Sequence, residues 1–273
     1  LTFTTNAGAL SSAVSNALVL GAGVGTQLTV TTQPSASAAN AVAFAAQPAI
    51  QLRDASTNPV ATAGVVITAA IASGGVALGG TLTATTDGTG LATFTNLSIT
   101  GLIGSRTLTF TSGILTAATS TAINITTGAR SKLTITTQPS ASATSDVAFA
   151  TQPVVRIEDS GGNPVSENLT GVTASLASGA VTLGGTLLAS TNAGGVASFT
   201  DLKITGATGA RTLLFAATGL TSATSSAVTL GAGSATQLTV TTQPSASAAN
   251  AVAFAAQPAI QLRDASTNPV ATA

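Results

Sequence analysis

The sequence predicts an all-β protein made of tandem antiparallel β-sandwich domains of about 105 residues each, arranged end to end. Two observations predict it: a strict internal repeat, and a period-two alternation of apolar residues with Thr or Ser. The segment Thr-Thr-Gln-Pro-Ser-Ala-Ser-Ala begins at Thr31, Thr136 and Thr241, at a constant spacing of 105 residues. This period is much longer than that of helical solenoid repeats, so each unit is expected to be a whole domain.

The alternation identifies the strands. Apolar side chains at every second position are typical of strands with one buried face, and the clearest runs lie at residues 28–31, 81–85, 107–111 and 121–125. Turn-forming residues separate such runs at 54–59, 74–75, 79–80, 87–90 and 101–104. About seven short strands per unit, with a turn every 8 to 12 residues or so, predict a two-sheet sandwich. The Ala-rich segment 63–72 is also expected to be strand, because it contains the β-branched run Val65-Val66-Ile67.

The repeat also sets the expected domain boundaries. Complete domains are expected at residues 24–128 and 129–233. Residues 1–23 would supply the last strands of a preceding domain, and residues 234–273 the first strands of a following one. Residues 26–63 recur unchanged as 236–273, whereas the copy between them matches at only about half of its positions. The repeating unit of the longer array is therefore expected to be a pair of domains.

Composition excludes several classes of partner and chemistry. Eight basic and eight acidic residues give a net charge of zero, and only 6% of residues are charged, compared with roughly 25% in ordinary soluble domains. Such a chain has no basic patch for nucleic acid. The uncharged stretch 59–86 is interrupted by Gly pairs, so membrane insertion is not expected. Cys, His, Met, Trp and Tyr are all absent, which removes disulfides and most catalytic side chains.

Phenylalanine is the only aromatic residue in the sequence. Within the two complete units it recurs at equivalent positions: Phe44, Phe94 and Phe110 in the first, and Phe149, Phe199 and Phe215 in the second. On alternating strands these side chains are expected to be core anchors and the largest buried groups of each domain. Stacking against a ligand is the alternative role.

A comparison of the two complete units argues against catalysis. Only Asp54/Asp159 and Arg106/Arg211 are ionisable and identical at equivalent positions, and one Asp with one Arg is too little for an active site. No enzyme activity, catalytic residue or cofactor is therefore expected. The two Asp residues are expected to cap the turn before Asn-Pro. The two Arg residues are expected to open a strand and to pair with a carbonyl or a carboxylate.

Calcium is the one metal that the sequence raises. Glu158, Asp159 and Asn163 lie close together near a turn, and calcium sites use oxygen ligands of this kind. The first unit offers only Asp54 and Asn58 at this turn. Because a single carboxylate makes a weak site, these three residues are weak candidates and no metal is expected.

Three motifs occur in the same order and at matching spacing in both complete units. They are residues 54–60, 90–94 and 104–108 in the first unit, and residues 159–165, 194–199 and 209–213 in the second. These motifs resemble the bacterial immunoglobulin-like repeats of giant surface proteins, of the invasin and intimin kind. The resemblance implies immunoglobulin-like sandwiches used as extracellular spacers, with recognition at a terminal domain outside this sequence. It implies no functional residues, and the sequence departs from better-known members in its low charge and its lack of Trp and Tyr.

The leading interpretation is therefore a non-catalytic structural repeat of a bacterial extracellular or cell-surface protein. It would form a fibre, a stalk or a self-associating filament, and copies of the chain itself would be its partners, because a surface with few charges lacks the repulsion that keeps domains apart. The alternative is an adhesin repeat that binds surface glycans or a neighbouring cell. Such sites usually show exposed aromatic side chains, and here the aromatics are expected at core positions.

Overall fold

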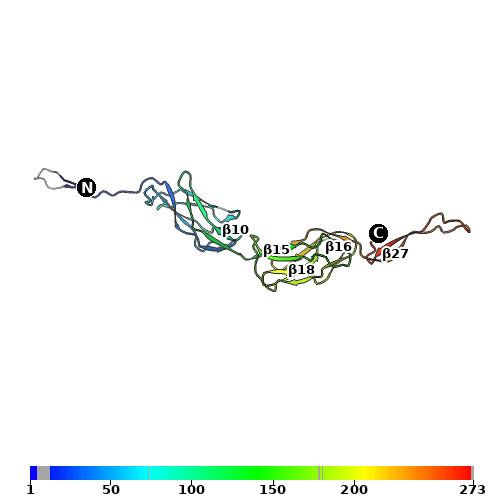
Figure 1. Cartoon of the computed structure of the whole chain (residues 1–273). Coiled ribbons are helices and arrows are strands. Elements are labelled where there is room, and N and C mark those ends of the chain that lie inside the picture. Colours follow the sequence, from blue (N-terminus) through cyan, green and yellow to red (C-terminus); the bar gives the residue numbers. More distant parts are fainter. Residues whose placement is uncertain (5–12, 73, 178, 180, 272–273) are drawn as a thin grey trace. The chain divides into compact units, whose positions relative to one another are not determined.

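The computed structural model describes residues 1–4, 13–72, 74–177, 179 and 181–271. Every regular element in these residues is a β-strand, and none is a helix (Figure 1). The all-β fold class expected from the sequence is confirmed. The chain forms two compact units. The first comprises Leu1–Ala38, Val42–Ile99 and Gly104–Ile125, and the second comprises Ala39–Ala41, Thr100–Ile103 and Thr126–Ala273.

The first sandwich is built from short strands. They are β3 (Gln27–Thr32), β4 (Ser37–Ala39), β5 (Ala49–Arg53), β6 (Val66–Ile71), β7 (Ala77–Gly79), β8 (Thr83–Thr85), β9 (Leu91–Thr93), β10 (Ser98–Thr100), β11 (Gly104–Arg106), β12 (Leu108–Thr111), β13 (Ala118–Thr119) and β14 (Ile123–Thr126). The larger sheets have the strand orders β13-β12-β6-β8 and β3-β5-β9, and smaller ones are β11-β14-β4 and β10-β7. The Ala-rich segment is strand β6, as predicted.

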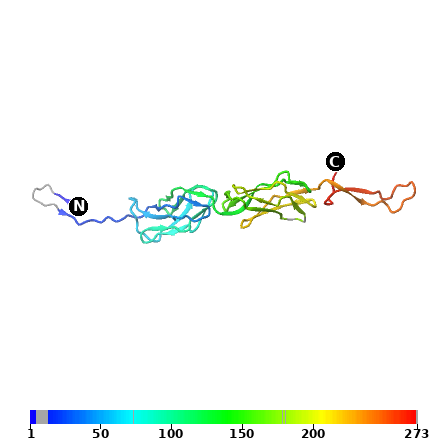
Figure 2. The same ribbon diagram turned by 90° about the horizontal axis from the view of Figure 1, so that it is seen from below.

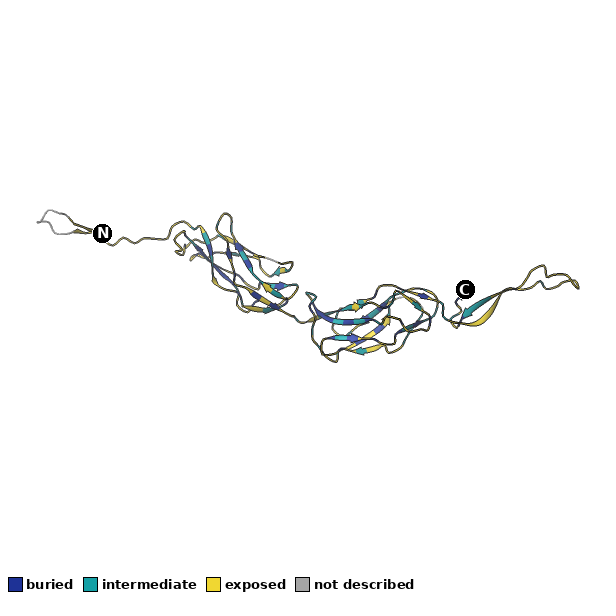
Figure 3. Ribbon diagram, in the orientation of Figure 1, coloured by how far each residue is buried: buried dark blue, intermediate teal, exposed yellow. Residues whose placement is uncertain are grey.

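Alternation along these strands produces the core. On β6 the side chains of Ile67 and Ala69 are buried, while Val66 and Thr68 face outward. Phe110 on β12 pairs with Ala69 across the ladder and is fully buried. Alternate positions of β6 and β12 therefore supply the core, and the positions between them are exposed or partly buried (Figure 3). The hydrophobic core runs from Leu28 to Ile125.

The second sandwich repeats this plan with a core of its own, from Leu133 to Leu230. Its strands are β15 (Arg130–Thr137), β16 (Ser142–Thr144), β17 (Val154–Asp159), β18 (Gly171–Leu176), β19 (Thr182–Gly184), β20 (Leu188–Ser190), β21 (Val196–Ser198), β22 (Lys203–Thr205), β23 (Gly209–Arg211), β24 (Leu213–Ala216), β25 (Ala223–Thr224) and β26 (Val228–Gly231). The sheet orders are β20-β18-β24-β25, β15-β17-β21, β16-β26-β23 and β19-β22. Figure 2 shows these strands, coloured green to yellow, running alongside one another.

Two details differ from the expected antiparallel sandwich of about seven strands. Each sandwich contains more strands, because several are only two or three residues long. In addition, β16 pairs with β26 in parallel. The chain leaves the β15 ladder at the buried Pro139, which has no N–H group to continue it. The next residues then join the opposite sheet beside β26.

The chain ends form two small ladders. Near the N-terminus, β1 (Thr2–Phe3) pairs with β2 (Ala13–Val14), and residues 5–12 of the expected partial domain lie outside the described residues. Near the C-terminus, β27 (Ala235–Thr242) pairs with β28 (Ala259–Asp264) in the register of β15 with β17. Phe3 and Phe254 are 60% and 47% exposed in these segments. The expectation that all aromatics occupy core positions is therefore wrong for these two residues.

The described residues contain no helix with the length and apolarity required to cross a bilayer.

The six phenylalanines of the two sandwiches, unlike Phe3 and Phe254, are all at most 4% exposed. Phe94 and Phe110 pack as a tilted pair with ring centroids 5.3 Å apart. Phe199 and Phe215 repeat that pair at 5.2 Å with the same interplanar angle of 48°. Burial on this scale leaves no face of these six rings for stacking against a ligand.

Candidate functional site

The most ordered polar arrangement is a turn that begins with Asp159 at the end of β17. Its Oδ1 accepts hydrogen bonds from the backbone N–H groups of Gly161 and Asn163, each at 2.9 Å. Its Oδ2 accepts another from the N–H of Gly128, 31 residues earlier, also at 2.9 Å. Asp159 therefore caps the turn, and it also fastens the segment that leads into β15.

Asp54 makes the same contacts at the end of β5. Its Oδ1 accepts from the N–H groups of Ser56 and Asn58, at 2.9 and 2.8 Å, and its Oδ2 accepts from Gly23 at 2.8 Å. The residue before the Asn has a positive φ, +67° at Thr57 and +88° at Gly162. Threonine rarely adopts this conformation, so the carboxylate bonds stabilise a turn that local propensity does not favour.

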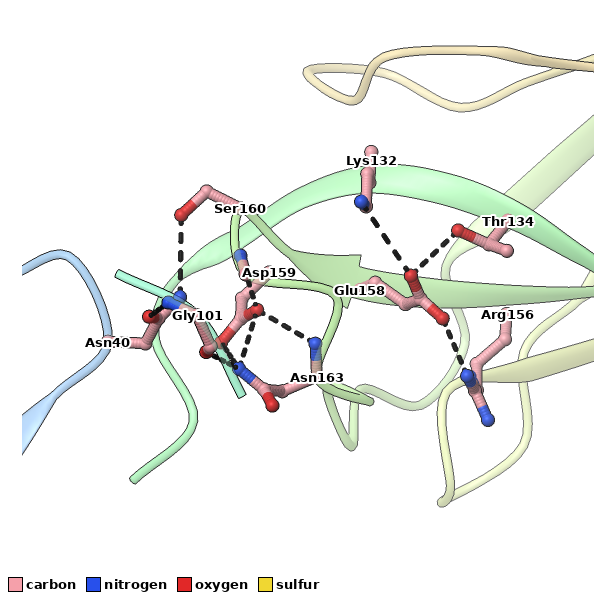
Figure 4. A network of polar contacts seen from close by, with 10 residues as sticks. Asn40, Gly101, Lys132, Thr134, Arg156, Glu158, Asp159, Ser160 and Asn163 are labelled. Atoms are coloured by element: carbon pink, nitrogen blue, oxygen red, sulfur yellow. Dashed lines mark hydrogen bonds and ion pairs between the residues drawn. The ribbon is translucent and has the colours of Figure 1, made fainter. Parts of the chain in front are cut away.

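Asn163 extends the network within the second unit (Figure 4). Its Nδ2 donates to both carboxylate oxygens of Asp159, at 3.0 and 2.9 Å, and to the carbonyl of Gly101 at 2.8 Å. Its Oδ1 accepts from the N–H of Ile103 at 2.9 Å. Asn40 braces the same segment, because its Oδ1 accepts from the N–H of Gly101 at 2.8 Å. Asp159 and Asn163 are both essentially fully buried.

These bonds keep the carboxylates ionised. Burial by itself raises the pKa of Asp159, but hydrogen bonds from Gly128 and from Asn163 outweigh it, so this pKa is lowered. At Asp54 the side-chain hydrogen bond from Asn58, followed by the N–H of Gly23, lowers the pKa to about 2. Each carboxylate is charged at neutral pH and is held by N–H groups.

The calcium candidates do not form a site. Asp159 and Glu158 are successive residues of β17, so their side chains point to opposite faces. Figure 4 shows Glu158 turned toward Lys132 and Arg156, while Asp159 is turned toward Asn163. The oxygens of Asp159 and the amide oxygen of Asn163 already accept N–H groups, which would repel a cation. No group of three acidic residues that could hold a metal occurs in the part of the chain that the structure describes.

Arg211 holds a loop rather than a carboxylate. Its guanidinium donates to the carbonyls of Ala207 and Ala210, at 2.8 and 2.7 Å, and more weakly to Thr208 at 3.4 Å. Arg106 donates to the carbonyl of Ser105 at 2.8 Å. Both Arg residues end a short strand, β11 or β23, instead of opening one. The expectation of a strand start was wrong because residues 107 and 212 separate these strands from β12 and β24.

Two roles of amide side chains were not predicted from the sequence. One is the pair of hydrogen bonds that Asn163 makes to the backbone of Gly101 and Ile103. The other belongs to Gln152, whose Nε2 donates to the carbonyls of Phe149 and Leu202 while its Oε1 accepts from the N–H of Leu202. These roles could have been suspected from the sequence, because Asn-Pro and Gln-Pro dipeptides each recur at the same place in every copy.

One small cavity, of about 180 Å³, lies in the second unit. Its lining includes Asp146, Thr205, Ser234, Asp264 and Ser266. Asp146 pairs with Lys203 at 2.7 Å, and Asp264 accepts N–H groups from its own turn. The hydroxyl of Thr205 donates to Asp146 at 3.2 Å. In the described part of the chain, the serine hydroxyls that line the cavity have no neighbouring base to activate them as nucleophiles.

No protein-family model matches this sequence, and a search of curated proteins finds no match. Solved structures do match. The adhesin FdeC of Escherichia coli aligns over 92% of this chain and 78% of its own, with 19% identity and a TM-score of 0.36. The Yersinia pseudotuberculosis adhesin InvE aligns over 81% of this chain and 65% of its own, with 18% identity and a TM-score of 0.30.

A fragment of intimin, solved with the intimin-binding domain of its translocated receptor, aligns over 80% of this chain and 67% of its own. Its identity is 15% and its TM-score is 0.27. Bacterial glycosidases match as well, each over about a quarter of its own chain. The solved structures thus include the kind of adhesin that the sequence motifs resemble. At these identities and TM-scores the likeness concerns the fold class and carries no function or residue role to this chain.

Proposed function

We propose that this chain is a non-catalytic structural part of a long extracellular surface protein, in which tandem sandwiches form a fibre, a stalk or a self-associating filament. The proposal is carried by the turn at Asp54 and Asp159. This Asp and Arg106/Arg211 are the only ionisable residues that are identical at equivalent places in both sandwiches. The Asp carboxylate accepts hydrogen bonds from N–H groups of the chain itself. A carboxylate saturated in this way organises the backbone and has no free oxygen for a substrate.

The surface supports association between copies. Only 6% of residues are charged and the net charge is zero, so two copies meet little electrostatic repulsion. Leu188 on the edge strand β20 is 59% exposed, and Val66 on β6 is 53% exposed. Exposed apolar side chains on strands favour lateral contact with another sheet.

Electron microscopy of the purified chain in negative stain tests this proposal. Ordered filaments of constant diameter are the expected result if copies associate laterally, and isolated beaded threads are expected for a simple stalk. Compact particles without linear order would overturn both forms of the proposal. Images at 50 mM and 500 mM salt should look alike, because so few charges are involved.

An adhesin repeat that binds surface glycans is the second candidate. The cavity of about 180 Å³ favours it, because the hydroxyls of Ser234 and Ser266 line it and could exchange hydrogen bonds with a sugar. A glycan array probed with the whole chain tests this function. Binding that is lost in Ser266→Ala would support it, and an array without signal would remove it.

A further inference from the structure

A second copy of the Asn163 contact occurs at Asn268. The Nδ2 of Asn268 donates to the carbonyl of Gly206 at 2.9 Å, and its Oδ1 accepts from the N–H of Thr208 at 3.0 Å. Asn163 makes the same pair of bonds to Gly101 and Ile103. In each case an Asn amide spans a carbonyl and an N–H two residues apart, and both pairs lie inside the second unit.

The Asn side chain hydrogen-bonds to the backbone of the loop and not to its side chains. Each loop has the pattern Gly-x-x-Gly, with the middle residues Leu102 and Ile103 in one copy and Ala207 and Thr208 in the other. Leu102 is 61% exposed and Ile103 is 48% exposed. Since the middle side chains differ and point away, any loop with this backbone conformation would fit the Asn.

The glycines explain why the backbone is accessible. Gly206 and Gly209 have φ values of +145° and +132°, and Gly101 and Gly104 have +151° and +128°. L-residues rarely adopt this region. A Cβ on Gly209 would also lie 3.1 Å from the guanidinium of Arg211, which holds the same loop through the carbonyls of Ala207 and Thr208.

The Asp carboxylate positions the Asn on its other side. Asp264 accepts the Nδ2 of Asn268 at 2.8 Å and the N–H of Gly233 at 2.7 Å. One carboxylate thus connects the linker glycine, the turn and, through Asn268, the loop 206–209. Asp264 and Asn268 are 2% and 6% exposed, so these bonds are shielded from competing water.

We propose that the Asp-x-x-x-Asn turn is a docking site for the Gly-x-x-Gly loop of the repeat before it, so that consecutive repeats are joined by a side-chain clasp as well as by a linker. The proposal rests on the tandem arrangement proposed above. The partner is a second copy of the same fold, recognised through its main chain. Arg211 then serves the same purpose as Asp264, because it holds the loop 206–209 through the carbonyls of Ala207 and Thr208.

The turn at Asp54 and Asn58 is the third copy of the site. Residues 26–63 are identical to residues 236–273, so Asn58 has the same local sequence as Asn268. Among the described residues, the side-chain amide of Asn58 has only Asp54 as a partner, and Asn58 is exposed. By this identity it is an open site for the same kind of loop, and it also provides a matched control.

Amide hydrogen exchange on the whole chain tests the clasp. In Asn268→Ala the N–H of Thr208 should exchange at least tenfold faster, because it loses its acceptor. The N–H of Leu213 donates to the buried Ser225 Oγ at 2.9 Å, so it should keep its protection and report that the sandwich is folded. Asn58→Ala should change neither amide. Unchanged exchange at Thr208 in Asn268→Ala, or equal acceleration in Asn58→Ala, would overturn the proposal.

Spin labels test whether the clasp fixes the position of the C-terminal ladder β27–β28 relative to the second sandwich. The chain has no native Cys, so Thr173→Cys on β18 and Thr239→Cys on β27 would carry the only labels, both at exposed positions. The expected distance distribution is narrow in this pair, broad after adding Asn268→Ala, and narrow after adding Asn58→Ala. A distribution that Asn268→Ala leaves unchanged would overturn the clasp. It would not affect the stalk proposal, whose own test is the shape of the particles in the microscope.

Discussion

The two sandwiches use the same strand pair in different ways. In the first, β3 and β5 carry Gln27, Gln51 and Arg53, and these side chains donate to backbone carbonyls at Asp54, Thr89 and Thr57. In the second, the equivalent residues on β15 and β17 are Lys132, Arg156 and Glu158, and they form an ionic cluster around the Glu158 carboxylate. The backbone register is nevertheless the same in both pairs.

The difference shows which residues specify the fold. The three positions hold two amides and one cation in the first sandwich, and two cations and one carboxylate in the second. The strands nevertheless keep the same register. The core phenylalanines and the Asp turn, in contrast, superimpose in their contacts, with ring pairs at 5.3 and 5.2 Å. Packing and turn chemistry therefore determine the sandwich, and these three polar positions of the strand pair are free to vary.

Removal of a core phenyl ring should have the largest effect, and the same effect in both sandwiches. Phe94→Ala and Phe199→Ala should each lower the free energy of unfolding of their own sandwich by about 3–5 kcal/mol, because each leaves a cavity. Urea denaturation followed by circular dichroism measures this. Phe254→Ala, at an exposed position, should change stability by less than about 0.5 kcal/mol. Clearly unequal losses at Phe94 and Phe199 would contradict the equivalence of the two cores.

Asp159→Ala should be the next most damaging change, with a loss of about 2–3 kcal/mol, because buried N–H donors lose a charged acceptor. Asp146→Ala is the control. Its salt bridge with Lys203 is solvent-exposed, and such pairs contribute little. Thermal unfolding monitored by circular dichroism would compare the two. Equal melting temperatures for both variants would show that the turn network is not stabilising.

Transplanting the three residues of the first sandwich should cost less stability than breaking the ionic cluster. Glu158→Ala leaves Lys132 and Arg156 without their carboxylate and should cost about 1–2 kcal/mol. The triple variant Lys132→Gln, Arg156→Gln, Glu158→Arg recreates the first sandwich and should stay within about 1 kcal/mol of the parent. Urea midpoints decide between these outcomes. A triple variant less stable than Glu158→Ala would mean that the second sandwich requires its ionic cluster and cannot accept the residues of the first.

Acid should lower the free energy of unfolding of both sandwiches gradually, by protonating their turn Asp residues, and this effect should be smaller than those of the substitutions above. The pKa of Asp54 is lowered to about 2 and that of Asp159 is also lowered. A lowered pKa means that the folded state binds the proton less readily than the unfolded state. The stability from Asp54 should thus be complete above about pH 4 and be lost as the pH falls through about 2. Urea midpoints measured from pH 6 to pH 2 should decline less steeply in Asp54→Asn, and an unchanged slope would contradict the assignment.

Much of the fold could be predicted from the sequence. The strands around Leu28, Phe110 and Ile123 were visible as period-two alternation, since burial of one strand face imposes that pattern directly on the chain. The capping role of Asp54 and Asp159 was predictable for a similar reason, because the capped N–H groups lie close by in the sequence, two and four residues after each Asp. The parallel pairing of β16 with β26 was not predictable, because Ser142 and Thr229 are brought together by the closure of the whole sandwich.

The clasp shows the same limit. The dipeptide Asn-Pro recurs in the sequence, but nothing local indicates that Asn163 and Asn268 span a carbonyl and an N–H about 60 residues earlier. Glu158 and Asp159 are neighbours in sequence and were therefore candidates for one metal site, but the pleat of β17 turns their carboxylates to opposite faces. The sequence by itself determined the repeat, the strands and the buried phenyl rings, since each depends on residues close together in the chain. Only the tertiary structure decided which distant backbone groups the repeated turn would hold, because hydrogen bonds between remote segments depend on how the sheets pack and leave no periodic signal in the chain.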